Sequence, residues 1–175
     1  MTGSSLTLTQ INALDRPGFI AALEHLFEGP PWIVEAAWDA HPFATLDDLQ
    51  SKLVAVMYAA PVERQVALIQ AHPDLVGRAA LAGTLTPAST GEQAAAGLDS
   101  LTSDEIATFT RLNAEYRERF GFPFVICARE NKKESILAGF AQRMNHTCDD
   151  EITTALGEIA KICRLRLLDT IRAAV

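Results

Sequence analysis

The chain has 175 residues, hydrophobic residues make up 49% of it, and its formal net charge at pH 7 is −7. This length suits a single domain over residues 1–175 with a substantial core. The acidic charge argues against a protein that binds nucleic acid or an anionic membrane, because such proteins need basic patches. No uninterrupted apolar segment approaches the roughly 20 residues that cross a bilayer, so no membrane partner is expected.

The cysteines give a prediction about the compartment. Cys127, Cys148 and Cys163 are an odd number and form no CxxC pair. This spacing predicts neither a disulfide framework nor a zinc site, and reduced thiols are typical of the cytosol. The first ten residues, MTGSSLTLTQ, also lack the basic region and apolar run of a secretory signal. We therefore expect a soluble cytoplasmic protein.

Helical periodicity runs through almost the whole chain. In the N-terminal part, Asp15 has the position of a cap for a first helix, and Gly29-Pro30-Pro31 ends that helix. A short second helix is expected over residues 32–40. Thr45 and Asp48 resemble a capping box, which predicts a third helix directly after them.

The next helix is expected to end at His72, because the following Pro73 disfavours helical geometry in the residue before it. Residues 82–91 form the longest predicted loop. A short helix is then expected with its N-terminus near Ser89 and Thr90, since polar capping residues precede an alanine-rich run there.

The C-terminal part has a second capping box, Thr102 with Glu105, at the start of a long helix. Glycine, proline and β-favouring residues in GFPFVICA then predict a short extended segment near 121–128. Two further helices are expected over about 132–145 and 150–173. The whole pattern predicts an all-α protein, a compact single-domain bundle of about eight or nine helices with one short extended segment.

Metal-ligand clusters and nucleophile motifs are not evident in the sequence. The four histidines fall in different segments, HEXXH and GxSxG are absent, and no glycine-rich phosphate loop occurs. The stretch from His146 to Glu151 contains ligand types, but Asp149 and Asp150 more simply place negative charge at the start of the last helix. We therefore predict no metal site.

Acid–base catalysis is the remaining possibility, and His72 and Glu92 are the candidate residues for it. His72 places an imidazole at a helix end, where it can transfer protons or only complement the helix dipole. Glu92, followed by Gln93, stands just inside a predicted helix N-terminus, where plain capping is the simpler alternative. Neither residue identifies a reaction by itself.

Helical geometry separates Arg166 from Arg164 on the last helix. Arg166 follows Ile162 by four residues and therefore falls on the apolar stripe, whereas Arg164 points away from it. An arginine on the inner face needs an anionic partner, from the protein or from a ligand. A structural salt bridge, or a stem that reaches back to water, is an equal alternative. The rest of the stripe consists of Ile152, Leu156, Ile159 and Cys163.

Four separated motifs, in order along the chain, carry a resemblance to a known family. They are HPDLVG (72–77), SxxEQ (89–93), LNAEYRERFGFPFVICARENKK (112–133) and EIAKICRLRL (158–167). With these motifs the sequence resembles the 2-oxo-4-hydroxy-4-carboxy-5-ureidoimidazoline (OHCU) decarboxylases, from about residue 15 to about residue 170. Several motifs in the same order make the resemblance specific, although each alone is weak.

The resemblance implies an all-helical decarboxylase that converts OHCU into (S)-allantoin and CO2 in urate and purine catabolism. It implies a small ureide substrate, no cofactor, no metal and no nucleic-acid partner, and family members often form homodimers. By the resemblance, His72 and Glu92 are catalytic. The implied substrate-binding residues are Pro73, Ser89, Thr90, Gly91, Glu92, Gln93, Phe124, Val125, Ile126, Cys127, Ala128 and Arg166.

Two other functions stay open from the residues alone. One is a related cofactor-free hydrolase or isomerase that acts on ureides. The other is a helical interaction module without activity, which the all-α pattern alone would allow. Polar groups on expected inner faces favour an enzyme, because a scaffold has no need of them there.

Overall fold

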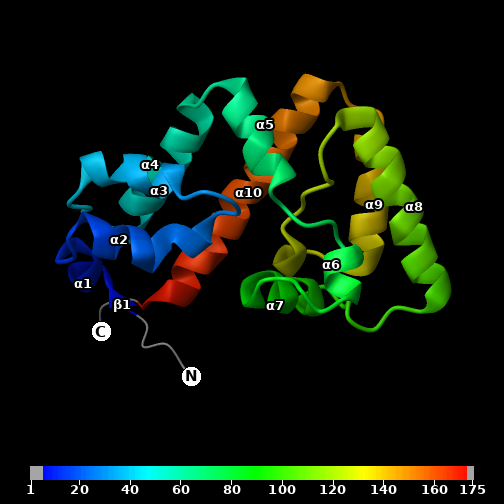
Figure 1. Ribbon diagram of the computed structural model, residues 1–175, viewed down its shortest axis with the longest axis horizontal. Helices are drawn as coiled ribbons and strands as arrows, with labels where there is room; N and C mark the ends of the chain where they lie inside the picture. The colour runs from blue at the N-terminus through cyan, green and yellow to red at the C-terminus, as the bar shows by residue number, and fades with distance from the viewer. Residues whose placement is uncertain (1–5, 173–175) are drawn as a thin grey trace. The chain divides into compact units, whose positions relative to one another are not determined.

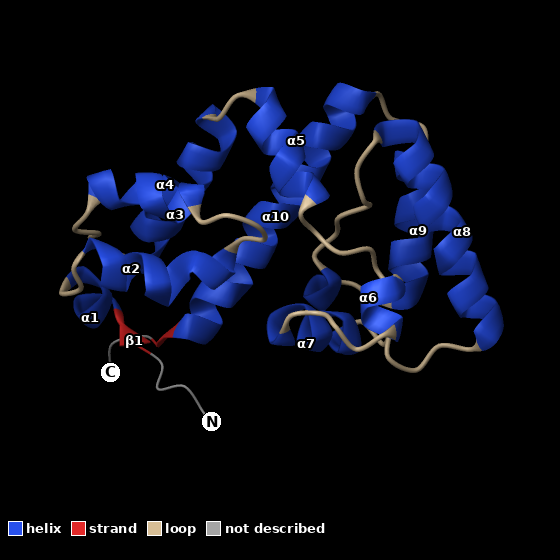
Figure 2. Ribbon diagram, viewed as in Figure 1, coloured by secondary structure: helices blue, strands red, loops and turns tan. Residues whose placement is uncertain are grey.

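The computed structural model describes residues 6–172. The first five residues, on which part of the expectation about a secretory signal rests, lie outside this range. Within it, ten α-helices and three short 3₁₀ segments dominate, and the strands β1 (Leu6–Thr7) and β2 (Ile171–Arg172) pair in parallel (Figure 1 and Figure 2). The prediction of an all-α protein is confirmed. None of the helices within 6–172 has the length and apolar character of a membrane span.

Contacts divide the chain into two compact units. Unit 1 comprises the residues up to Gln65 together with those from Ala160 onward, and unit 2 comprises Val66–Ile159. The boundaries fall inside helices α5 (Val62–Gln70) and α10 (Cys148–Thr170). The expectation of a single domain stays a prediction.

Unit 1 is built from the N-terminal helices and the end of α10. Helix α3 packs against both α2 and α4 and buries Ile33 and Val34. The helices that lie wholly in this unit are α1 (Leu8–Asn12), α2 (Arg16–Leu23), α3 (Trp32–Ala37) and α4 (Leu46–Ala59), and the 3₁₀ segments are η1 (Glu24–Leu26) and η2 (Trp38–Ala40).

Unit 2 has an aromatic core between α8 and α9, which lie side by side (Figure 1). The rings of Phe124 and Phe140 stack with their centroids 3.9 Å apart, and Tyr116 meets both rings edge-on. The helices that lie wholly in this unit are α6 (Arg78–Leu81), α7 (Pro87–Ala95), α8 (Ser103–Phe120) and α9 (Lys133–Arg143), and the 3₁₀ segment is η3 (Ala128–Glu130).

Local capping signals located three helix starts correctly. The side chain of Asp15 caps α2, and the side chain of Thr45 caps α4. Thr102 and Glu105 form the predicted reciprocal capping box at the start of α8. Each cap supplies an acceptor for a backbone N–H that has no partner within its own helix.

The secondary structure of residues 78–95 differs from the prediction. The sequence predicts a loop over 82–91 and a helix start near Ser89, but α7 begins at Pro87. The reason is local, because Thr86 accepts the N–H of Ser89 at 3.2 Å and proline suits the first position of a helix. The short helices α1 and α6 were also missed, since neither is long enough for an apolar repeat, so residues 6–172 contain ten helices where eight or nine were expected.

Candidate active site

His72 is held at the end of α5. The regular helix stops at Gln70, two residues earlier than predicted, but the N–H of His72 still donates to the carbonyl of Ile69 at 3.1 Å. The residue is only 6% exposed, and its Nδ1 lies 2.9 Å from the carbonyl oxygen of Leu68. Because a carbonyl only accepts, Nδ1 carries the proton, and the basic lone pair of the neutral ring is on Nε2.

The loop after His72 contains one strained residue. Val76 is buried and has φ of 53°, in the left-handed region that β-branched residues rarely enter. The side chain of Gln93 accepts the N–H of Val76 at 3.0 Å, and Asn113 donates to the carbonyl of Leu75 at 2.7 Å. Such strain persists only where the surroundings over-determine the backbone. Helices α7 and α8 therefore fix the chain that follows His72.

The same loop is closed by Asp74 and Gly77. Asp74 accepts from the guanidinium of Arg117 on α8 at 2.9 Å. A Cβ at Gly77 would lie 2.6 Å from the Cβ of Asp74, which is too close for any other residue without movement of the backbone. The HPDLVG motif is thus a compact turn that requires its glycine.

Helix α7 carries the second group of predicted site residues. Ser89 and Gln93 are buried, with exposed fractions of 4% and 7%, and Glu92 is half-buried. Glu92 is the sixth residue of α7, and the first turn of the helix has no acidic residue. Plain capping, the simpler alternative from the sequence, therefore does not account for Glu92.

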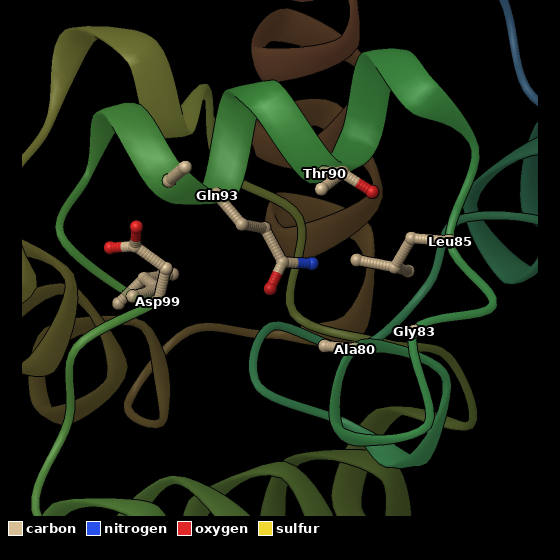
Figure 3. A pocket seen from close by; sticks show the side chains of 8 residues that line it. Ala80, Gly83, Leu85, Thr90, Gln93 and Asp99 are labelled. Carbon is tan, nitrogen blue, oxygen red and sulfur yellow. The ribbon is translucent and has the colours of Figure 1, made fainter.

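The predicted stretch 89–93 is divided between two sides of α7. Successive residues of a helix turn by about 100°, so Thr90 lies nearly opposite Glu92. Thr90 and Gln93 project from α7 toward a pocket of about 270 Å³ (Figure 3). The structure thus separates the Thr90 side chain from Glu92. The pocket is also lined by Ala80, Gly83, Leu85, Ala94, Leu98 and Asp99.

The prediction that the chain leaves helical structure near 121–128 is confirmed for residues 121–127, and Ala128 already belongs to η3. Residues 121–127 have no helical structure, and the main chain is anchored at two points. The carbonyl of Val125 accepts from Arg143 at 2.7 Å, and the N–H of Cys127 donates to Glu158 at 2.8 Å. These bonds fix the main chain of the segment at Val125 and at Cys127.

Glu92 acts electrostatically on this segment. Burial, followed by the negative charges of Glu130, Glu158 and Glu92, raises the pKa of the Cys127 thiol to about 11. Helix α7 also contacts η3, which directly follows the segment. The carboxylate of Glu92 and the predicted substrate segment therefore belong to one region of unit 2.

The helical-wheel separation of the two arginines is confirmed. Arg166 is only 4% exposed, and its guanidinium bonds Glu28 at 3.0 Å and the carbonyl of His25 at 3.1 Å. Arg164 pairs at 2.6 Å with Asp47, whose side chain is 78% exposed. The alternative of a structural salt bridge thus holds for Arg166, with Glu28 as its partner in the chain.

The predicted site residues fall in both units. His72, Pro73, Ser89–Gln93 and Phe124–Ala128 belong to unit 2, whereas Arg166 belongs to unit 1. That Arg166 belongs to the same substrate site as His72 and Glu92 stays a prediction. In the described part of the chain, no group of three or more His, Cys, Asp or Glu side chains is arranged to hold a metal ion.

Two buried polar side chains bind the main chain of the site but were not predicted from the sequence. Asn113 shares the inner face of α8 with Tyr116, and Arg143 shares the inner face of α9 with Phe140. The spacing of three residues within each pair is the signal, because it places a polar side chain on an apolar stripe. The same argument had already singled out Arg166.

The comparison with family models identifies the family. A model described as OHCU decarboxylase matches residues 12–168. The chain belongs to the OHCU decarboxylase family. The match covers both units, so the family assignment does not depend on one motif.

Two relatives in this family match almost the whole chain. A 2-oxo-4-hydroxy-4-carboxy-5-ureidoimidazoline decarboxylase of Amia calva is 41% identical over 167 residues, which cover 95% of each chain. The protein of the same name from Haloferax volcanii is 42% identical over 164 residues, which cover 94% of this chain and 95% of that protein.

Solved structures of similar proteins have the same architecture. The crystal structure of (S)-allantoin synthase has a TM-score of 0.77 at 27% identity, and the match covers 95% of this chain and 54% of that chain. The crystal structure of an OHCU decarboxylase in the presence of (S)-allantoin has a TM-score of 0.66 at 21% identity, with 81% of this chain and 91% of that chain covered. The second likeness concerns the fold alone.

Proposed function

We propose that this protein is a cofactor-independent carboxy-lyase that converts OHCU into (S)-allantoin and CO2 in urate degradation. The observation that carries the proposal is the buried His72, whose tautomer is fixed by Leu68, in a chain of the OHCU decarboxylase family. An imidazole with one defined basic nitrogen is suited to proton transfer near neutral pH.

The substrate explains why few protein groups are needed. One ring carbon carries both the carboxylate and the hydroxyl, and the neighbouring ring carbon has a C=N bond. When the bond to the carboxylate breaks and CO2 leaves, the electron pair moves into that C=N system, and the ring nitrogen takes up a proton from solvent. The hydroxyl then loses its proton and becomes a carbonyl, while the neighbouring carbon gains a proton on one face. The electron sink belongs to the substrate itself.

His72 has the central role in this scheme. Its Nδ1–H is committed to the carbonyl of Leu68, so proton transfer falls to Nε2. The ring accepts the proton of the substrate hydroxyl and supplies the proton that makes allantoin chiral. The compact HPDLVG turn holds the backbone next to the imidazole, so protons are exchanged with one face of the substrate.

Glu92 and the extended segment bind the ureide. The carboxylate of Glu92 accepts from ureido N–H groups or orients His72, and Ser89 and Gln93 add polar contacts from α7. The N–H of Cys127 and the carbonyls of Val125, Cys127 and Ala128 already have protein partners. The main-chain contacts to the ring are therefore assigned to the remaining peptide groups of 124–128. Pro73 and Phe124 present apolar faces to the flat ring.

Arg166 is proposed to fix an anionic or carbonyl oxygen of the substrate. A guanidinium has five donors in a planar fork that matches carboxylate and carbonyl oxygens, the kinds of acceptor that Arg166 binds in Glu28 and His25. Family resemblance supports this role, together with the burial of the residue.

A cytoplasmic location and a homodimer complete the proposal. The location is supported by Cys127, Cys148 and Cys163, which are all free thiols in the structure.

The homodimer rests on family resemblance. Analytical ultracentrifugation of the purified protein at micromolar concentration tests it, and a single monomer species would exclude it.

The decisive experiment adds the purified protein to enzymatically generated OHCU and follows the circular dichroism of the product. We expect loss of OHCU faster than its spontaneous decay and accumulation of (S)-allantoin. No acceleration over spontaneous decay would overturn the proposal. Formation of a different ureide without CO2 release would instead indicate a hydrolase or isomerase.

A further inference from the structure

Unit 2 contains a buried polar cluster outside the predicted site. Glu151 is fully buried, and its carboxylate accepts from Arg143, from the hydroxyl of Tyr116 and from Nδ1 of His146. The ion pair between Arg143 and Glu151 has an N–O distance of 2.9 Å. Burial and the bond to Glu151 raise the pKa of Tyr116, so its hydroxyl stays protonated and donates.

Arg143 extends from this cluster to the extended segment. Its Nη1 donates to the carbonyl of Val125 at 2.7 Å, and the centre of its guanidinium lies 4.3 Å from the ring centroid of Phe124. The ring of Phe140 also stacks on that of Phe124, with the two centroids 3.9 Å apart. One arginine therefore holds a peptide group and a neighbouring side chain of the segment at once.

Stability alone does not account for this arrangement. A buried ion pair costs so much desolvation that apolar residues of similar volume often stabilise a fold equally well or better. Apolar residues could replace Arg143 and Glu151 within the aromatic core, but they could not donate to the carbonyl of Val125. The distinctive property of the cluster is thus its bond to the main chain of the segment.

We propose that Arg143 is a positioning residue for substrate, and that it acts through residues 124–128. This inference rests on the proposed function only in taking the segment as the substrate-binding one. The ion pair with Glu151 orients the guanidinium, and the guanidinium fixes the direction of the Val125 carbonyl. Along an extended chain successive groups point to opposite sides, so fixing one carbonyl fixes the direction in which the adjacent peptide groups face the ring. Arg143 itself touches no substrate.

The matched pair of variants is Arg143→Lys and Tyr116→Phe. Lysine keeps a positive charge for Glu151 but lacks the planar fork that also reaches Val125 and stacks on Phe124. Phenylalanine at position 116 removes the hydroxyl that donates to Glu151 and accepts from Arg143 at 3.3 Å. It keeps the ion pair between Arg143 and Glu151 and the contact between Arg143 and Val125. Both changes affect the same buried cluster, so both are expected to lower the melting temperature.

Steady-state kinetics with OHCU separate positioning from stability. We expect Arg143→Lys to raise KM by about tenfold with a smaller change in kcat, because small displacements of binding groups are costly. Tyr116→Phe should keep KM near the wild-type value at a comparable melting temperature. If KM rose in both variants in proportion to the fall in melting temperature, the inference would be overturned.

Hydrogen–deuterium exchange provides a readout that needs no activity. Arg143→Lys should speed exchange in the peptide that covers 122–128 more than Tyr116→Phe does. Equal exchange of this peptide in both variants would also overturn the inference. If the wild-type protein fails to decarboxylate OHCU, the proposed function is wrong, and exchange alone then decides whether Arg143 holds the segment.

A second pair keeps the test valid if Arg143→Lys does not fold. The double variant Arg143→Gln/Glu151→Gln removes both buried charges together, so neither is left unpaired. Its control is again Tyr116→Phe, which retains the ion pair between Arg143 and Glu151. The double variant should show the raised KM and faster exchange, and Tyr116→Phe should not.

Discussion

Nδ1 of His72 and the carbonyl oxygen of Leu68, one turn earlier in α5, lie 2.9 Å apart. The bond satisfies a carbonyl that the helix end would leave without an N–H partner. It also assigns the proton to Nδ1 and leaves Nε2 as the basic nitrogen. The two interpretations of His72, helix-end residue and acid–base group, are therefore compatible.

For His72→Asn we expect a folded protein that has lost decarboxylation rate by about 10²–10⁴-fold. Asparagine can hydrogen-bond but cannot transfer a proton near neutral pH. The allantoin that forms should be close to racemic, because protonation then comes from water. Circular dichroism of the product, together with a thermal melt of the variant, measures both effects.

His41 provides the matched control for this prediction. Like His72, it has a ring nitrogen next to a backbone carbonyl oxygen, since its Nε2 lies 2.8 Å from the carbonyl oxygen of Asn12. His41 belongs to no predicted site. His41→Asn should lower the melting temperature without loss of chirality in the product. If His72→Asn instead gave pure (S)-allantoin at a near-normal rate, His72 would have only its helix-end role.

Arg166→Ala and Arg164→Ala should differ sharply. Arg164 pairs with the exposed Asp47, so its loss should change the free energy of unfolding by no more than about 0.5 kcal/mol and leave kinetics unchanged. Removal of Arg166 leaves Glu28 without its buried cation, which typically costs about 3–5 kcal/mol. It should also raise KM for OHCU or lower kcat.

The variant Glu28→Gln distinguishes a substrate-binding role of Arg166 from a purely structural one. The amide oxygen of glutamine can still accept from the guanidinium, but the ion pair is gone. We expect this variant to lose stability with little change in kinetics. If Arg166→Ala altered kinetics no more than Glu28→Gln or Arg164→Ala does, the proposed substrate role of Arg166 would be wrong.

Cys127 should resist alkylation at pH 8 in the native protein. Its pKa is raised to about 11, so the reactive thiolate is scarce at pH 8 and becomes abundant only as the pH approaches that value. The exposed Cys148 should react first with iodoacetamide, as measured by mass spectrometry of the peptides. In denaturant both thiols should react alike, and equal native rates at pH 8 would contradict the prediction.

Chelator treatment should leave decarboxylation unchanged. The proposed chemistry uses the C=N bond of the substrate as its electron sink, so it gives a metal ion no role. The measurement compares rates before and after dialysis against EDTA. Activity that is lost on dialysis and returns only with an added divalent ion would refute this prediction.

The sequence by itself determined the features that depend on neighbouring residues. Asp15, Thr45 and Thr102 cap helices as predicted, because a cap and the N–H groups it satisfies are only a few residues apart. The same holds for the inner position of Arg166, since helical periodicity alone assigns a face. The extended segment followed from glycine, proline and β-favouring residues in one short stretch.

Only the tertiary structure decided which groups these residues meet. Glu28, the partner of Arg166, lies 138 positions away, and the partners of Val125 and Leu75 come from other helices. The left-handed backbone of Val76 was equally hidden, because a valine there gives no local sign of it. Helical periodicity shows which side chains face inward, but hydrogen-bond partners depend on the packing of distant elements, and packing leaves no periodic pattern in the sequence.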